Sequence, residues 1–278
     1  MESISVRVPA TSANLGPGFD CLGVALDLHG QVTVTRGPAG APDAMVDSAA
    51  RSFFDAAAVS AFAFAWSVCA EIPRSRGLGS SVVVRLGILH GLNELAGRPL
   101  DAGALYRLCA RLEGHPDNAA PAAFGGFTTA RPDSVYFRCE IAPELRFVLL
   151  VPGEQIETDH SRVQLPREIP HADAAINTAL ATMITAAFAS RDYELLRGSM
   201  DDRLHQPYRA PGVPHLRRAI DAGVDAGALG GYLSGSGSAV ACITLAGPTD
   251  VAAAMQSVLP SAQVMVLGPD NRGVVIGR

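Results

Sequence analysis

The chain has 278 residues, of which 48% are hydrophobic and 18% are charged, and its formal net charge is −5. This length allows one large or two ordinary domains, at roughly 100–200 residues each, and the composition is typical of a globular protein rather than a disordered one. The acidic balance and the lack of a basic stripe argue against a nucleic-acid binder. The five cysteines stand singly in the sequence, which indicates reduced thiols in a cytoplasmic protein rather than disulfides or a zinc site.

One apolar stretch, residues 53–70, approaches the length of a membrane span. Its second half alternates large and small side chains, as in FAFAWSV, and a period of two predicts a strand. We therefore expect a helix around residues 47–58, a strand around residues 61–72 and no membrane segment. The first residues, MESISVRVPAT, also lack the basic and apolar pattern of a secretory signal.

Hydrophobic periodicity, together with glycine and proline punctuation, predicts the other elements. Strand-like segments are expected at residues 4–8, 21–27, 31–35, 145–151, 263–267 and 274–276, and a strand–turn–strand unit is expected at residues 231–245. Helices are expected at residues 81–95, 101–112, 172–189, 193–204, 214–222 and 251–258. This mixture of strand pairs and helices is typical of an α+β fold rather than a regular βαβα wind. A domain boundary is expected just before the apolar strand at residues 145–151.

A glycine- and serine-rich turn, PRSRGLGSS at residues 73–81, lies between a predicted strand and a predicted helix. Gly77 and Gly79 let the backbone turn tightly and approach a ligand, and the helix start supplies unpaired N–H groups and the positive end of a dipole. Ser80 and Ser81 offer hydroxyls to a phosphate oxygen or to Mg²⁺. The Walker pattern is absent because no lysine follows the glycines. Short glycine motifs also match often by chance, and a simple helix-capping turn explains this segment equally well on its own.

Three further dense loops favour a ligand site. They are PATSANLGPGFDCLG at residues 9–23, EGHPDNAAPAAFGG at residues 113–126 and GYLSGSGS at residues 231–238. The second loop brings two acidic groups, a histidine and an asparagine together, and the third is another glycine-rich turn that could cover a phosphate or a substrate. Glycine turns usually serve backbone geometry and acidic clusters are usually solvated, but four such loops in one chain point to a site.

At these residues the sequence resembles the GHMP kinases and, within that superfamily, the homoserine kinase family. The motifs VPATSANLGPGFDCLGVAL, PRSRGLGSS, EGHPDNAAPAAFGGF, HQPYR and SGSG follow the family's order and span nearly the whole chain. The resemblance implies a two-domain α+β fold. Residues 1–143 would resemble domain 2 of ribosomal protein S5 and bind ATP, and residues 144–278 would form a ferredoxin-like domain that contributes to the substrate site.

The implied reaction transfers the γ-phosphoryl group of ATP to the side-chain hydroxyl of L-homoserine, on the route to threonine. The residues implied for ATP are Pro73, Arg76, Gly77, Leu78, Gly79, Ser80 and Ser81. Ser81 and Glu113 would hold Mg²⁺, which prefers hard oxygen ligands. Where relatives usually carry small residues, β-branched valines occupy residues 82–84, and we expect them to crowd the phosphate end of the helix. A homodimer is compatible with the resemblance.

Homoserine is a zwitterion, so its site needs an anion for the ammonium group and a cation for the carboxylate. The substrate-binding residues that the resemblance implies are Asn14, Asp20, His115, Asp117, Arg162, Arg209 and Gly235. The two arginines would hold the carboxylate, where a guanidinium fork fits well. Asp20, Asn118 and Arg209 are the catalytic candidates. Phosphoryl transfer is largely a matter of positioning and charge neutralisation, so proton removal by Asp20 or Asp117 and direct attack by the hydroxyl both stay open.

Three other functions stay open at this stage. The first is a GHMP kinase that acts on threonine, a mevalonate-like alcohol or a sugar. The second is a catalytically weak homologue that binds a metabolite, although a sensor has little need of Glu113 and the two serines of the turn. The third is a nucleic-acid module, since S5-like folds occur in ribosomal proteins, but the acidic balance argues against it.

Overall fold

The computed structural model describes residues 2–154 and 158–277. Its strands are β1 (Ser3–Ala13), β2 (Leu22–Arg36), β3 (Phe64–Ala70), β4 (Phe127–Ala130), β5 (Tyr136–Cys139), β6 (Arg146–Val151), β7 (Gly230–Leu233), β8 (Val240–Thr244), β9 (Gln263–Leu267) and β10 (Val275–Gly277). Its helices are α1 (Ala44–Ala57), α2 (Ser80–Leu95), α3 (Ala102–Glu113), α4 (Ala119–Phe124), α5 (Thr158–Val163), α6 (His171–Ser190), α7 (Gln206–Arg209), α8 (Leu216–Asp225) and α9 (Pro248–Val258), with 3₁₀ turns η1 (Tyr193–Leu196) and η2 (Ala210–Gly212).

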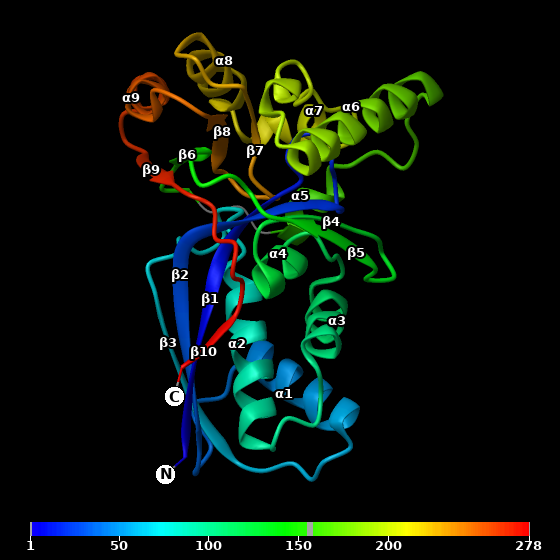
Figure 1. Ribbon diagram of the computed structural model, residues 1–278, viewed down its shortest axis with the longest axis vertical. Coiled ribbons are helices and arrows are strands. Elements are labelled where there is room, and N and C mark those ends of the chain that lie inside the picture. The colour runs from blue at the N-terminus through cyan, green and yellow to red at the C-terminus, as the bar shows by residue number, and fades with distance from the viewer. Residues whose placement is uncertain (1, 155–157, 278) are drawn as a thin grey trace.

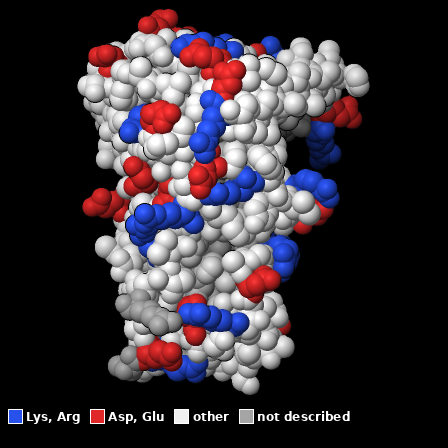
Figure 2. All heavy atoms as spheres, in the orientation of Figure 1, with Lys and Arg blue, Asp and Glu red and all other residues white. Residues whose placement is uncertain are grey.

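The described elements form two lobes, one above the other (Figure 1). The larger, antiparallel sheet has the order β10-β1-β2-β4-β5, with β3 also paired to β2. Helix α2 packs on β1 and β2 and also contacts α1, α3 and α4, so it is the central helix of this lobe. Acidic and basic side chains are interspersed over the face shown in Figure 2, in keeping with the absence of a basic stripe in the sequence.

The smaller sheet confirms the expected ferredoxin-like arrangement. Its elements follow the chain order β6-α8-β7-β8-α9-β9, and its strands lie in the order β7-β8-β6-β9 with every pair antiparallel. Helices α8 and α9 contact each other and pack on this sheet. The division between residues 143 and 144 stays a prediction. The last strand, β10, returns to the larger sheet and pairs with β1, where Ile276 lies opposite Val6.

Helix α2 lies unusually close to β2 because two of its residues are glycines. A Cβ atom added at Gly87 would lie 2.3 Å from Cγ2 of Val32, and one added at Gly91 would lie 2.4 Å from Cγ2 of Val34. The bare helix backbone therefore rests on the valine side chains of the strand. This contact sets how close α2 lies to the sheet, and it therefore positions the first turn of α2 beside the end of β1.

Two expectations from the sequence have clear outcomes. The alternation in residues 61–72 does produce a strand, β3, whose large side chains pack on the core. The helix expected over residues 193–204 is wrong. The chain forms only the short turn η1 because Gly198 adopts a left-handed conformation, with φ of +75°. The carboxylate of Asp202 then accepts hydrogen bonds from the backbone N–H groups of Leu204, His205 and Gln206, and α7 begins there instead.

Replacing Gly87 with alanine should destabilise the protein, although alanine is the better helix former. The added methyl group would overlap Val32, and overpacking of this kind costs about 1–3 kcal/mol. The matched control is Gly103→Ala in α3, where the new Cβ meets only the tips of Arg107 and Asp101 at 3.3 and 3.4 Å. That change should stabilise by about 0.4–1 kcal/mol. Urea unfolding of both variants checks this, and equal shifts of the same sign would contradict the close contact.

Candidate active site

A cleft opens where the end of β1, the start of α2, the segment after α3 and the turn between β7 and β8 meet. Its lining residues are Asn14, Phe19, Asp20, Ser75, Gly77, Leu78, Gly79, Ser80, Ser81, Glu113, His115, Asp117, Asn118, Arg162, Arg209, Gly235 and Ser236. All the substrate, catalytic and metal candidates from the sequence are therefore in one place. Among the ATP candidates, Pro73 and Arg76 do not line the cleft. Phe19, Ser75 and Ser236 line it and were missed.

The start of α2 provides the anion-binding end of the cleft. Gly77 and Gly79 have φ angles of +80° and +68°, which L-residues rarely adopt. Gly79 is the N-cap of α2 and so provides no side-chain cap for the N–H groups of the first turn. The strand β1 approaches this turn directly, because Thr11 donates its N–H to the carbonyl of Leu78 at 3.2 Å. The first turn of α2 thus presents backbone donors at the positive end of the helix dipole.

The two glycine-rich turns pack backbone against backbone. A Cβ atom at Gly77 would lie 1.9 Å from the carbonyl oxygen of Ser234, and one at Gly237 would lie 2.1 Å from the carbonyl carbon of Arg76. The hydroxyl of Ser234 donates to the carbonyl of Gly77 at 2.7 Å. The second turn therefore closes one end of the cleft from the other lobe, and glycine is required there for close approach.

Arg76 links the two lobes through hydrogen bonds to main-chain carbonyls. Its Nε donates to the carbonyl of Pro152 at 2.8 Å, its Nη1 donates to the carbonyl of Arg74 at 3.0 Å, and its Nη2 donates to the carbonyl of Gly153. The side chain is nearly buried. These contacts tie the phosphate turn to the segment after β6, and they direct the guanidinium to main-chain carbonyls rather than into the cleft.

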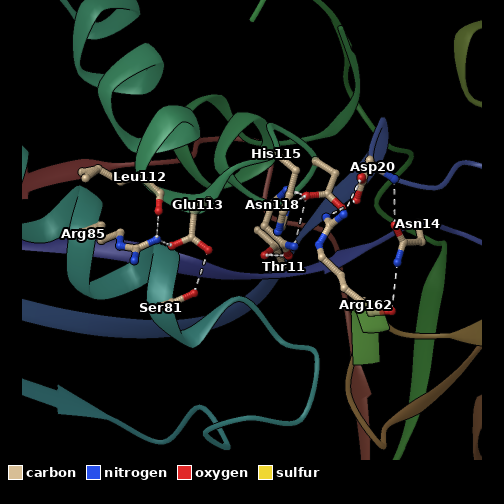
Figure 3. A network of polar contacts seen from close by, with 12 residues as sticks. Thr11, Asn14, Asp20, Ser81, Arg85, Leu112, Glu113, His115, Asn118 and Arg162 are labelled. Atoms are coloured by element: carbon tan, nitrogen blue, oxygen red, sulfur yellow. Dashed lines mark hydrogen bonds and ion pairs between the residues drawn. The ribbon is translucent and has the colours of Figure 1, made fainter. Parts of the chain in front are cut away.

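Glu113 and Ser81 lie side by side, as expected for a metal pair (Figure 3). The Ser81 hydroxyl donates to Oε2 of Glu113 at 2.9 Å. Neighbouring ligands of an octahedral Mg²⁺ ion with bonds near 2.1 Å are about 3.0 Å apart, so these two oxygens fit adjacent coordination positions. Arg85 fixes the carboxylate from its other side, because its Nη1 donates to Oε1 of Glu113 at 2.5 Å and to the carbonyl of Leu112 at 2.7 Å.

The valines that follow Ser81 do not crowd this site. Val82 and Val83 are 0% and 1% exposed, and both belong to the hydrophobic core. Val83 packs toward β2, since a Cβ at Gly30 would lie 2.5 Å from its Cγ1. None of the three valines lines the cleft, so the sequence-based expectation of crowding is not supported.

The loop after β1 presents Asp20. Asn14 has a left-handed backbone and so does Asp20, with φ angles of +74° and +59°. The amide of Asn14 bridges the lobes, because Oδ1 accepts from the N–H of Asp20 at 3.0 Å and Nδ2 donates to the carbonyl of Gly235 at 2.8 Å. Arg162 then grips both oxygens of the Asp20 carboxylate, at 3.0 and 2.7 Å. The loop is therefore held in a shape that aims this carboxylate into the cleft.

Two arginines converge on Phe19. The guanidinium carbons of Arg209 and Arg162 lie 5.3 and 5.5 Å from the ring centroid, and His205 stacks on the same ring at 5.2 Å. Burial lowers the pKa of Arg209 to about 10, and the nearby charge of Arg162 adds to the shift. Within the described part of the chain, Nε of Arg209 is buried and has no hydrogen-bond partner. A pair of guanidiniums with an unused buried donor suits a ligand carboxylate.

A second polar cluster lies opposite Asp20. His115 Nδ1 forms an ion pair with Oδ1 of Asp117, which also accepts from the N–H of Asn118 at 2.8 Å. Thr11 fixes the Asn118 side chain by donating its hydroxyl to Oδ1 at 2.7 Å. Each of Asp20, His115 and Asp117 has one atom that could ligate a cation, and these three atoms lie within 4.8 Å of one another. This cluster can accept a cation, and an ammonium group fits the carboxylates.

The pKa of His115 reflects two opposing effects. Burial lowers it, but the charge of Asp117 and its hydrogen bond raise it, and the net pKa lies above 6.5. Asp117 therefore favours the imidazolium form at this position. The sequence placed both residues at the site but gave no sign that one sets the charge of the other.

Comparison with known proteins gives the class. Residues 44–126 match the family described as GHMP kinases N terminal domain, and residues 184–261 match GHMP kinases C terminal. The chain thus has the two-domain fold of a GHMP kinase. The chain is 37% identical to a homoserine kinase of Thermus thermophilus, over 100% of this chain and 97% of that one. It is also 37% identical to that of Gloeobacter violaceus, over 96% and 97%.

A solved structure shows the same fold. The crystal structure of homoserine kinase from Cytophaga hutchinsonii matches with a TM-score of 0.90 and 24% identity, over 100% of this chain and 98% of that chain. Because the relatives from Thermus thermophilus and Gloeobacter violaceus are 37% identical to the chain over 97% of their length, the chain belongs to the homoserine kinase family.

The charge of His115 can be tested by NMR titration. In the wild-type protein we expect its pKa above 6.5, and in Asp117→Asn we expect a lower pKa, because the charge and the hydrogen bond of Asp117 no longer oppose the effect of burial. His90, whose pKa burial lowers to about 4, is the internal control and should not move. Since folding raises the pKa of His115, its stabilising contribution is complete at low pH and is lost as the pH rises through the folded-state pKa. A wild-type pKa at or below 6.5 would contradict the pairing.

Proposed function

We propose that this protein transfers the γ-phosphoryl group of ATP to the side-chain hydroxyl of L-homoserine and so produces O-phospho-L-homoserine. The observation that carries the proposal is the combination of groups in one cleft. An anion-binding helix start and an oxygen pair suited to Mg²⁺ lie at one end, and a pair of arginines opposite carboxylates lies at the other. The homoserine kinases of Thermus thermophilus and Gloeobacter violaceus, to which the chain is similar, support the same reaction.

The phosphate end uses backbone donors and a metal. The chain contains no lysine, so the phosphate charge must be met by the first turn of α2, by arginine or by Mg²⁺. Glu113 and Ser81 would hold the ion, which when bound neutralises charge on the phosphate oxygens. Arg85 supports this role by fixing the Glu113 carboxylate with one oxygen turned toward Ser81.

The substrate end recognises a zwitterion. Arg209 and Arg162 would bind the carboxylate, and Asp20 with Asp117 would bind the ammonium group. In the described conformation Arg162 and Asp20 satisfy each other, so the substrate can replace both partners at once, with its ammonium on Asp20 and its carboxylate on Arg162. This exchange leaves no charge unpaired in the cleft, and an uncompensated charge there would be costly.

Catalysis would then depend on position more than on a strong base. Asn118, held by Thr11, and Asp20, held by Asn14, are fixed donors and acceptors near the place where the substrate hydroxyl would lie. Arg209 would anchor the other end of the same small molecule. Fixing both ends aligns the hydroxyl with the γ-phosphorus, and such alignment supplies much of the rate enhancement in phosphoryl transfer.

We also infer a cytoplasmic location. All five cysteines are free thiols. Burial raises the pKa of Cys109 well above 9 and that of Cys242 to about 12. Inert, protonated thiols in the core suit a reducing compartment.

A coupled assay of ADP release tests the proposal. We expect turnover with L-homoserine and not with threonine or mevalonate. Glu113→Gln should lower kcat by about 100-fold or more while homoserine binding, measured by calorimetry, persists. Glu140→Gln is the matched control, because Glu140 is 58% exposed on the surface, and should keep full activity. Turnover with another alcohol but not with homoserine would contradict the proposed substrate, and an unchanged Glu113→Gln rate would contradict the metal role.

A further inference from the structure

Arg85 lies one turn after Ser81 on α2, so the two side chains are on the same face of the helix. Figure 3 shows both of them directed at the carboxylate of Glu113. Ser81 donates its hydroxyl to Oε2 at 2.9 Å, and Nη1 of Arg85 donates to Oε1 at 2.5 Å. The two oxygens of this one carboxylate are therefore held by different partners.

Arg85 contacts the carboxylate from one side only. Its Nη1 also donates to the carbonyl of Leu112 at 2.7 Å, which is one of the last carbonyls of α3 and lacks a partner within that helix. Its Nε is buried and has no hydrogen-bond partner in the described part of the chain. Among the described residues the guanidinium thus bonds to Glu113 through Nη1 and Oε1 alone, rather than through the two parallel hydrogen bonds of a bidentate pair.

The ion pair between Arg85 and Glu113 is shielded from water. The two side chains are 18% and 9% exposed, so solvent screens their attraction little, and a charge left unpaired there would be costly. Glu113 is also the last residue of α3, where the negative end of the helix dipole disfavours a carboxylate. For both reasons we expect the Arg85 contact to persist when the cleft binds a ligand.

A carboxylate held in this way offers a cation one oxygen. Mg²⁺ requires a nearly octahedral set of ligands at about 2.0–2.1 Å, whereas Ca²⁺ takes about six to eight oxygens at about 2.3–2.6 Å and often binds both oxygens of a carboxylate. Because Arg85 occupies Oε1, Glu113 cannot provide the second oxygen that Ca²⁺ would use. Its Oε2 and the Ser81 hydroxyl remain at the spacing of adjacent ligands of Mg²⁺.

We propose, on the basis of the kinase function proposed above, that Arg85 restricts Glu113 to coordination through one oxygen and so makes the metal site selective for Mg²⁺ over Ca²⁺. Arg85 does not line the cleft, so it is a positioning residue that acts on the ion only through Glu113. Its removal frees Oε1 to turn toward the ion. The carboxylate can then bind Ca²⁺ with both oxygens, and the advantage of Mg²⁺ decreases.

Calorimetry with a non-hydrolysable ATP analogue tests this role without turnover. The full chain is titrated with AMP-PNP saturated with Mg²⁺ or with Ca²⁺. The ratio of the two affinities is the informative quantity, because removal of a positive charge near the ion should strengthen the binding of both complexes. The wild type should prefer the Mg²⁺ complex. Arg85→Met should reduce that preference by about tenfold, since partners that orient metal ligands typically change metal affinity by about 10–100-fold.

Three further variants serve as controls, with circular dichroism to confirm the fold of each. Arg85→Lys should keep most of the preference, because its ammonium still brings a positive donor to Oε1. Arg85→Gln stops short of the carboxylate and should lose the preference as the methionine variant does, so it decides the question if that variant does not fold. Arg98→Met removes the arginine of an exposed ion pair with Glu94, whose atoms are 2.8 Å apart, and should keep the full preference.

An unchanged affinity ratio in Arg85→Met or Arg85→Gln, an equal loss in Arg98→Met, or a wild type that binds both complexes equally would overturn the role of Arg85. Glu113→Gln separates this result from the proposed function. It should abolish the preference, and a preference that survives it would contradict the metal role of Glu113 and the role of Arg85 with it. Because no alcohol is present in the titration, the result does not depend on which alcohol the enzyme phosphorylates.

Discussion

The cleft depends on one close contact, in which the backbone of the phosphate turn meets the backbone of the turn between β7 and β8. No side chain fits between Gly77 and Ser234 or between Gly237 and Arg76. Serine hydroxyls reinforce the contact, since Ser12 hydrogen-bonds to Ser234 at 2.8 Å and to Tyr232 at 2.9 Å in a buried position. Because each turn comes from a different sheet, this contact fixes the helix start that would bind phosphate relative to the arginines that would bind the substrate.

The charged groups of the cleft are held in place before any ligand arrives. Three carboxylates form ion pairs with basic side chains: Asp20 with Arg162, Asp117 with His115, and Glu113 with Arg85. Each carboxylate is thus paired with a cation rather than left buried alone, which would be costly. Phe19 helps to hold the two arginines of the cleft in place, because its ring lies near both guanidiniums and stacks on His205. Such preorganisation lowers the cost of ordering side chains around a small zwitterion.

Much of this arrangement could be predicted from the sequence, and the remainder has identifiable physical reasons. The glycine turn, Glu113 and Asp20 stand in dense local motifs, and local motifs are readable without a structure. Phe19 was missed because an aromatic residue inside a glycine loop has no periodicity to reveal its partners. The valines after Ser81 were misjudged because helix phase, which directs them to the core, depends on how α2 sits on β2. Likewise, Arg76 binds carbonyls from a segment far along the chain, which no local pattern indicates.

The proposed reaction requires that the buried Arg209 and the partly exposed Arg162 recognise a substrate carboxylate while the opposite end of the cleft presents the phosphate. The most direct test compares ADP release with L-homoserine and with 3-aminopropan-1-ol, which has the same amine and hydroxyl but no carboxylate, in the wild type and in Arg209→Met. Hydrogen bonds to a charged group contribute about 1.5–3 kcal/mol, so the wild type should favour homoserine by about 10–150-fold in kcat/KM. Arg209→Met should lose most of that preference, since only Arg162 then remains to bind the carboxylate, and should use the aminoalcohol as the wild type does. Equal use of both alcohols by the wild type, or an equal loss with both in the variant, would contradict the account.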